Sequence, residues 1–189
     1  MRVSRTCAGV LFAILLVAIV GVQPPPAAKA PSQSRADAVA ATPPMGWNSW
    51  DCFGTSVTEA EVKANADYMA ANLRRHGWQY IVVDIQWSEQ NPRSHGYRPD
   101  ADLAMDEFGR LVPAPNRFPS SAGGRGFKPL ADYVHGLGLK FGIHIMRGIP
   151  RRAVAADLPV SGSRARASGI ADRYSVCPWN GDMYGLDMT

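Results

Sequence analysis

The sequence predicts an α/β protein built from parallel βαβ units. Two helical patterns, each with one apolar stripe, alternate with short apolar runs that have the composition of buried strands. With 189 residues, 46% hydrophobic and 19% charged, the chain also has the composition of an ordinary globular protein. Because parallel strands need a long crossover, usually a helix, this alternation favours a parallel sheet.

The first βαβ unit starts with a strand expected at 45–50. Thr58 and Glu61 have the spacing of a capping box, so a helix should begin there and end at Gly77. A strand buried on both faces should follow at 80–84, where the residues are mostly β-branched. The apolar stripe of the helix has spacings of four, three and four and consists of Val62, Ala66, Met69 and Leu73.

The second unit consists of a helix at 127–137 and another buried strand at 139–145. These elements amount to three strands and two helices, whereas a closed (β/α)₈ barrel needs eight of each and roughly 250 residues. The sequence therefore predicts either a smaller α/β sheet or the front part of such a barrel, with the remaining part missing.

The segments outside these units are expected to be mostly loops. The stretch 93–120 is long for a βα connection, and 106–111 within it has the pattern of a small surface hairpin. From 146 to 189 we expect no further strand, and the arginines at 151–166 should lie in a solvated loop.

Residues 1–30 predict a secretory signal peptide. A short basic region precedes an apolar run at 8–22 and a small-x-small cleavage site that ends at Ala30. This run is shorter than the roughly 20 residues that cross a bilayer, so we expect a secreted protein with no membrane association after cleavage. The rest of the chain divides into a flexible Ala-, Pro- and Ser-rich leader at 31–42 and a folded domain at 43–189.

Charge and metal-ligand patterns argue against several other functions. All 16 acidic residues follow Ala30, whereas three of the 20 basic residues precede it, so the mature part carries a net charge of +1. No basic stripe remains for a nucleic acid. The four His are scattered and Cys-x-x-Cys is absent, so we expect no metal and no cofactor. After signal cleavage Cys52 and Cys177 remain, and an exported protein could bridge them.

Polar groups stand beside large apolar side chains at the ends of each of the three expected strands, and at the first two these include indoles. The carboxyl ends of parallel strands converge at one edge, where ligands of α/β proteins bind. A carboxylate can bind sugar hydroxyls there while an indole packs on the C–H face of the ring. The sequence therefore predicts a carbohydrate site, and its candidate residues are Trp47, Trp50, Asp84 and His144.

Each candidate also has a purely structural interpretation. Asp84 could cap the turn after its strand, although a carboxylate at the end of an Ile-Val-Val run is costly to bury without a use. Trp47, Trp50 and Trp87 could be core residues, and His144 could be a hydrogen-bonded core histidine.

Four sequence blocks resemble glycoside hydrolase family 27, the melibiase or α-galactosidase family. Their order and spacing over residues 42–146 make the resemblance specific, and the blocks are 42–54, 77–87, 127–135 and 138–143. The resemblance implies a secreted retaining glycosidase with a (β/α)₈ catalytic domain. This chain would then hold roughly the first three βα units of that barrel, and its partner would be a carbohydrate substrate.

The resemblance also implies roles for individual residues. Trp50 would pack against the sugar and Asp84 would bind its hydroxyls. A second Asp normally follows the first, and here Ile85 takes its place. A Tyr usually stands where His144 does, and Gln86 replaces a Cys that often forms a bridge. These replacements predict that the sugar is either galactose or a related α- or β-linked pyranoside.

A retaining glycosidase needs two carboxyl groups roughly 5 to 5.5 Å apart. The family places them at the ends of its fourth and sixth strands, which would lie beyond Thr189. Asp182 and Asp187 match neither motif and are expected in a loop. We therefore expect no catalytic residue in this chain and no hydrolysis by the chain alone. The alternative function is that of a secreted, non-catalytic sugar-binding or remnant domain.

Overall fold

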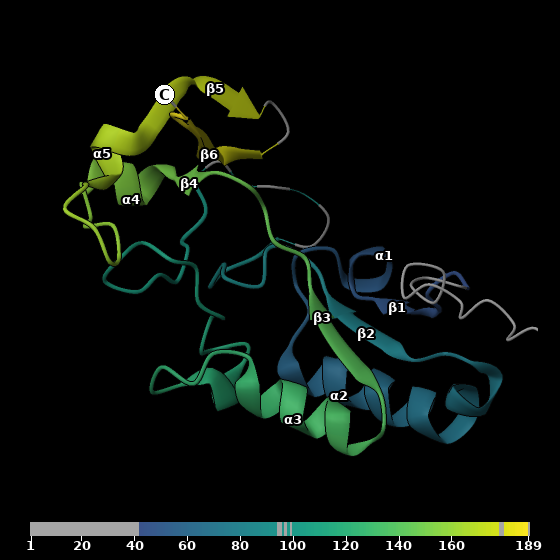
Figure 1. Ribbon diagram of the computed structural model, residues 1–189. Coiled ribbons are helices and arrows are strands. Elements are labelled where there is room, and N and C mark those ends of the chain that lie inside the picture. Colours follow the sequence, from purple (N-terminus) through teal and green to yellow (C-terminus); the bar gives the residue numbers. More distant parts are fainter. Residues whose placement is uncertain (1–41, 94–95, 97, 99, 178–179, 189) are drawn as a thin grey trace, which may run out of the picture. The chain divides into compact units, whose positions relative to one another are not determined.

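The computed structural model describes residues 42–188 except 94–95, 97, 99 and 178–179 (Figure 1). The described residues belong to one compact unit, Thr42–Thr189. The expected signal peptide and nearly all of the expected leader therefore lie outside the described residues. In the described part, every helix is too short or too polar to cross a membrane.

A parallel three-stranded sheet forms the centre of the described unit. Its strands, in sheet order, are β1 (Gly46–Asn48), β2 (Tyr80–Val83) and β3 (Lys140–Ile143). All three run in the same direction, so their carboxyl ends lie at one edge of the sheet. The predicted βαβ units are thus confirmed. Strand β1 is shorter than expected because the chain turns at once into the short helix α1 (Trp50–Phe53).

The first crossover helix, α2 (Glu59–Tyr68), begins with the predicted capping box. Thr58 Oγ1 accepts a hydrogen bond from the Glu61 N–H at 3.4 Å, and the Thr58 N–H donates to Glu61 Oε2 at 2.8 Å. Each side chain therefore satisfies a backbone donor that the first turn of a helix leaves without a partner.

The helix then changes its hydrogen-bonding pattern and ends where the sequence predicts. It continues as a π-helical turn, η1 (Met69–Leu73), and a 3₁₀ turn, η2 (Arg74–His76), up to Gly77. Gly77 has a φ of +92°, a left-handed conformation that glycine adopts without strain. The second crossover carries a 3₁₀ turn, η3 (Pro119–Ser121), and the helix α3 (Lys128–Gly136).

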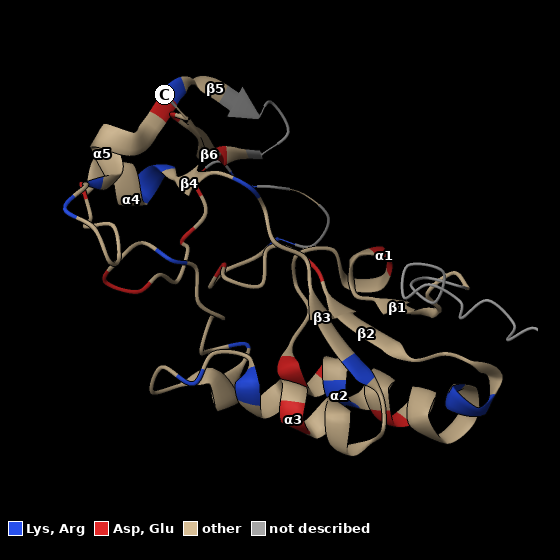
Figure 2. Cartoon of the chain, in the orientation of Figure 1, with Lys and Arg blue, Asp and Glu red and all other residues tan. Residues whose placement is uncertain are grey.

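Helices α2 and α3 lie side by side against one face of the sheet (Figure 1). The core between them and the sheet is apolar and includes Val62, Ala66, Met69, Ile81, Val83, Leu130 and Val134, all buried. Charged residues of both signs lie on the outer sides of these helices (Figure 2), where Lys128 and Asp132 form an ion pair at 2.6 Å.

The prediction that two strands are buried on both faces is wrong. In β2, Ile81 and Val83 are buried while Tyr80 and Val82 are only half-buried, because the helices cover one face alone. Strand β3 is an edge strand in the described part, and Ile143 and the following Ile145 are 42% and 65% exposed.

The prediction of no strand after residue 145 is also wrong. A second, antiparallel sheet has the order β4-β6-β5, and its strands are β4 (Ile149–Pro150), β5 (Ala171–Cys177) and β6 (Asn180–Leu186). Two short helices precede β5, namely α4 (Arg151–Ala155) and α5 (Ala167–Ile170). The sequence did not reveal these strands because apolar and polar residues do not alternate along β5 and β6. The two strands also pair with an irregular register.

The arginines expected in a solvated loop are mostly exposed, but the first two lie in a helix and two of the four form ion pairs. Arg152 lies in α4 and forms an ion pair with Asp102 at 2.5 Å, and Arg166 pairs with Asp157 at 3.1 Å. The predicted surface hairpin is confirmed by an antiparallel bridge between Met105 and Leu111. This hairpin and the second sheet together frame the region beyond the carboxyl end of β3.

Candidate functional site

Asp84 directly follows β2 at the edge where the parallel strands end. Its backbone N–H donates to Ser49 Oγ at 2.9 Å, and the Ser49 N–H donates to the Val82 carbonyl at 3.1 Å. Ser49 is completely buried and Asp84 is 8% exposed. The backbone positions of both residues are therefore fixed by the pairing of β1 with β2.

The Asp84 carboxylate gathers donors from all three strand ends. Oδ2 accepts from Asn48 Nδ2 at 2.7 Å, and Oδ1 accepts from the Ile85 N–H at 2.8 Å. His144 Nδ1 lies 2.7 Å from Oδ1, and the His144 N–H donates to the Val83 carbonyl at 2.9 Å. The sequence thus predicted correctly that the carboxylate and the imidazole come together. The bond to Ile85 shows that Asp84 also caps its own turn.

This arrangement leaves hydrogen-bonding capacity for a ligand. An ionised carboxylate has about four lone-pair sites. Three donors among the described residues occupy three of these sites, which leaves one for a ligand. Because a carboxylate only accepts, His144 Nδ1 carries a hydrogen toward Asp84, and a neutral ring then presents Nε2 as an acceptor. The His144 side chain is 47% exposed and Asp84 11%, so both groups reach solvent.

The indoles occupy two different environments. Trp47 is half-buried and packs edge-on against Phe53 at a ring distance of 6.1 Å, alongside the core. Trp50 is half-buried at the start of α1, and its backbone N–H donates to Asn48 Oδ1 at 2.8 Å. Asn48 therefore fixes Trp50 with one end of its amide and Asp84 with the other.

Trp87 is a core residue that also supports the site. It is 6% exposed and packs edge-on against Phe127 at 5.2 Å. Its Nε1–H donates to the His144 carbonyl at 2.9 Å, which ties the turn after β2 to the end of β3.

A buried arginine holds the loops behind the site. Arg117 Nη1 donates to the Gln86 and Glu89 carbonyls at 3.0 and 2.8 Å, and Nη2 donates to the Thr55 and Val57 carbonyls at 2.6 and 2.7 Å. Burial lowers the pKa of Arg117 to about 10, so the guanidinium is still charged at neutral pH. Sequence reasoning missed this residue because a lone arginine in a loop carries no local signal.

Asp182 does not lie in a loop, as the sequence suggested, but in β6. It is 5% exposed, and its Oδ2 accepts a hydrogen bond from Gln86 Nε2 at 2.8 Å. Burial raises the pKa of this carboxyl group against the opposing effects of its hydrogen bonds and of Arg151. Gln86, which stands where the family often has a Cys, thus joins the second sheet to the turn after β2.

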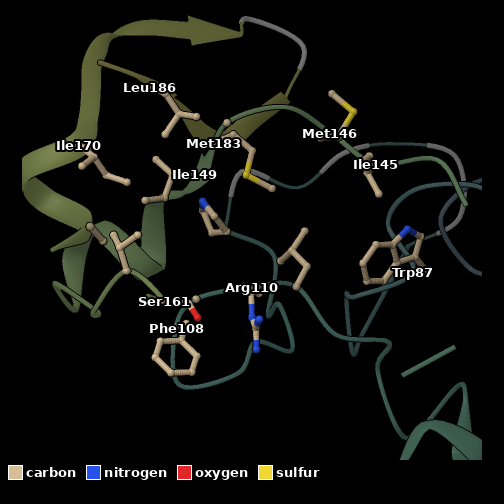
Figure 3. A pocket seen from close by; sticks show the side chains of 16 residues that line it. Trp87, Phe108, Arg110, Ile145, Met146, Ile149, Ser161, Ile170, Met183 and Leu186 are labelled. Carbon is tan, nitrogen blue, oxygen red and sulfur yellow. The ribbon is translucent and has the colours of Figure 1, made fainter. Parts of the chain in front are cut away.

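Two cavities adjoin this edge. The larger has a volume of about 410 Å³ and lies between the 105–111 hairpin and the second sheet (Figure 3). The smaller, of about 10 Å³, is lined by Ile85, Gln86, His144 and Asp182 among others. Trp47, Trp50 and Asp84 line neither cavity.

Only one of the two cysteines expected to pair has a side chain that the structure describes. Cys52 is exposed on α1 and forms no disulfide with a side chain that the structure describes. The side chain of Cys177 lies outside the described residues, so the disulfide remains a prediction.

The fold and the site together define a class of protein. Consecutive parallel βαβ units, with a carboxylate, an amide and an imidazole converging at the carboxyl ends of the strands, are the arrangement found in (β/α)₈ proteins. Residues 42–187 match the family model described as alpha galactosidase A. The chain belongs to this family, which is glycoside hydrolase family 27, and the predicted resemblance is confirmed.

The similar proteins include an arabinopyranosidase and alpha-galactosidases. A family 27 β-L-arabinopyranosidase from Geobacillus stearothermophilus is 66% identical with a TM-score of 0.75, over 77% of this chain and 34% of that structure. An alpha-galactosidase A from Cellvibrio japonicus is 39% identical over 82% of this chain and 32% of its own length. An alpha-galactosidase from Cyamopsis tetragonoloba is 42% identical over 54% and 21%. The chain thus spans about a fifth to a third of these relatives.

Proposed function

We propose that this chain forms the sugar-binding part of a secreted, retaining glycoside hydrolase. Its substrates are terminal pyranosides of galactose-like configuration, and β-L-arabinopyranosides are preferred to α-D-galactosides. The observation that carries this proposal is the Asp84 carboxylate, held at the carboxyl end of β2 by Asn48 and His144.

In this proposal Asp84 accepts a hydrogen from a sugar hydroxyl. The carboxylate is held by neighbours from three strand ends, so little rotational freedom is lost when a sugar binds. His144 Nε2 can accept from a second, adjacent hydroxyl. The indole of Trp50, whose backbone N–H is bound by Asn48, would offer an apolar surface for the C–H face of the ring.

The preference for an arabinopyranoside follows from Ile85. L-Arabinopyranose has the ring and hydroxyl arrangement of galactose but lacks the exocyclic CH₂OH group. Ile85 is 8% exposed and has no side-chain acceptor for the extra hydroxyl of a galactoside. An unmade hydrogen bond of this kind costs about 1–3 kcal/mol. The 66% identity to an arabinopyranosidase supports the same choice.

The chemical step is proposed to use carboxyl groups from outside this chain. Retention needs a nucleophile and an acid/base group roughly 5 to 5.5 Å apart, and we assign neither role to a residue of 42–188. Asp182 is buried against Gln86 and acts in fixing the second sheet.

A hybrid enzyme tests the proposal. Residues 42–187 replace the matching segment of the Geobacillus arabinopyranosidase, and kcat/KM is measured with 4-nitrophenyl β-L-arabinopyranoside and 4-nitrophenyl α-D-galactopyranoside. We expect the arabinoside to be cleaved within about tenfold of the parent rate and the galactoside more slowly. A hybrid that folds and binds arabinose but cleaves neither substrate would contradict the hydrolase and favour the non-catalytic sugar-binding domain.

A further inference from the structure

We propose that the larger cavity binds the aglycone of the substrate, and that this aglycone is an apolar, ring-containing group rather than a second sugar. The inference rests on the proposed function, because the aglycone is the group attached to the sugar that Asp84 holds. It adds the chemical class of the leaving group to that function.

The size and lining of the cavity fit an apolar ring. Its volume of about 410 Å³ falls within the roughly 300–1,000 Å³ of small-molecule sites. Most of its lining is apolar, including Phe108, Leu111, Ile149, Ile170, Met183 and Leu186 (Figure 3). The hydroxyls of a second sugar would find few partners there, and burying them unpaired is unfavourable.

The charged residue of the lining is already neutralised. Arg110 Nε donates to Asp106 Oδ2 at 2.6 Å within the hairpin, and its side chain is 65% exposed. The cavity therefore presents no uncompensated charge that would select an anionic ligand. A neutral aromatic or alicyclic group is the best match.

The walls of the cavity are held together by two close contacts. Gly109 has a φ of +75°, and a Cβ added to it would lie 2.6 Å from Ala153 Cβ. Gly148 has a φ of +110°, and an added Cβ would lie 2.4 Å from the Tyr184 carbonyl oxygen. The hairpin thus packs closely on α4, and the residue before β4 packs closely on β6. The ion pair between Arg152 and Asp102 joins the same two regions. The cavity is therefore preformed.

The larger cavity is linked to the surroundings of Asp84 through residues that it shares with the smaller cavity. It shares five lining residues with the smaller cavity, namely Trp87, Leu111, Ile145, Met146 and Met183. The smaller cavity is also lined by Ile85 and His144, two of the residues that form hydrogen bonds with Asp84. Trp87 lines both cavities, and its indole N–H donates a hydrogen bond to the carbonyl of His144, which lines the smaller one. In this proposal a group linked to a sugar on Asp84 lies in the larger cavity, beyond the side chains that the two cavities share.

Three probes on the full chain test the inference. 4-Nitrophenol reports the cavity, methyl β-L-arabinopyranoside reports the sugar site, and 4-nitrophenyl β-L-arabinopyranoside reports both. Binding is followed by calorimetry and by the tryptophan fluorescence of the chain, since Trp87 lines the cavity. We expect 4-nitrophenol to bind saturably at one site and the aryl glycoside to bind about tenfold or more tightly than the methyl glycoside.

Two variants change the cavity in different ways. Ile170→Trp fills it, and Leu186→Lys places a charge at a lining position that is already 45% exposed, so folding is preserved in at least one of them. Both variants should lower the binding affinity for 4-nitrophenol and for the aryl glycoside about tenfold and leave the affinity for the methyl glycoside unchanged. Met188→Lys is the matched control, because Met188 is 88% exposed and does not line the cavity.

Asp84→Asn separates this inference from the proposed function. This variant should lower the binding affinity for both glycosides and leave the affinity for 4-nitrophenol unchanged. No saturable binding of 4-nitrophenol, or an aryl glycoside that binds no tighter than the methyl glycoside, would overturn the aglycone site. If 4-nitrophenol binds in the cavity while the affinity for neither glycoside changes in Asp84→Asn, the proposed function is contradicted. The assignment of the cavity to the aglycone is then contradicted as well.

Discussion

Replacing Arg117 with Met should destabilise the chain by about 3–5 kcal/mol, the range for breaking a buried charged interaction. The guanidinium makes four hydrogen bonds to backbone carbonyls, and the residue is 6% exposed. Met fills a similar volume but donates to none of these carbonyls. Hydrogen bonds that involve a charged group contribute roughly 1.5–3 kcal/mol each, and relaxation of the loops together with relief of the buried charge offsets part of their sum.

The assay is urea unfolding followed by tryptophan fluorescence and far-UV circular dichroism. Small proteins lose about 1–3 kcal/mol per molar urea, so the midpoint should fall by more than about 1 M or the variant should be unfolded without urea. Arg117→Lys keeps the charge with at most three donors and should lose less.

Arg125→Met is the control for the side-chain change itself. Arg125 is exposed and binds one carbonyl, that of Ala122, so its loss should cost under about 0.5 kcal/mol. An Arg117→Met chain whose unfolding free energy lies within about 1 kcal/mol of the wild type would refute the reasoning, because the four carbonyls would then have found other partners.

Three further perturbations follow from the same structure. Ile85→Asp in the hybrid enzyme should raise the ratio of galactoside to arabinoside kcat/KM about 5- to 150-fold, as one added hydrogen bond predicts; an unchanged ratio would mean that Ile85 does not face the exocyclic carbon. Asp182→Asn should flatten the pH dependence of stability. The folded chain holds the Asp182 proton more tightly than the unfolded chain, so stability falls as pH rises from the ordinary pKa of 3.8 through the raised one, and the Asn variant should lose that fall in urea midpoints. Thr58→Ala should lower the unfolding free energy by about 0.5–2 kcal/mol through loss of the cap, while Thr42→Ala, in an exposed position before β1, should not.

The elements that the sequence predicted well are those with local causes. The capping box at Thr58 and Glu61 depends on residues three apart, and the stop at Gly77 depends on one residue's access to positive φ. The convergence of Asp84 and His144 was also predictable, although they are 60 residues apart, because parallel topology alone places their strand ends together.

What the sequence could not predict depends on contacts without a local pattern. Asn48 and Ser49 lie in a strand end that was singled out, yet their hydrogen bonds to Asp84 follow from pairing with β2 and not from residue type. Arg117 reaches Thr55, 62 residues away, and Asp182 reaches Gln86, 96 residues away. The exposure of Ile145 was missed because an apolar run looks the same in an edge strand and in a central one.

The claim on which the account depends is that Asp84 binds the sugar. The most direct measurement is kcat/KM for 4-nitrophenyl β-L-arabinopyranoside in the hybrid enzyme with Asp84→Asn, compared with Asp132→Asn on the exposed side of α3. The account predicts a loss of about 100-fold or more for Asp84→Asn and none for Asp132→Asn. Equal activity of the two folded variants would contradict it.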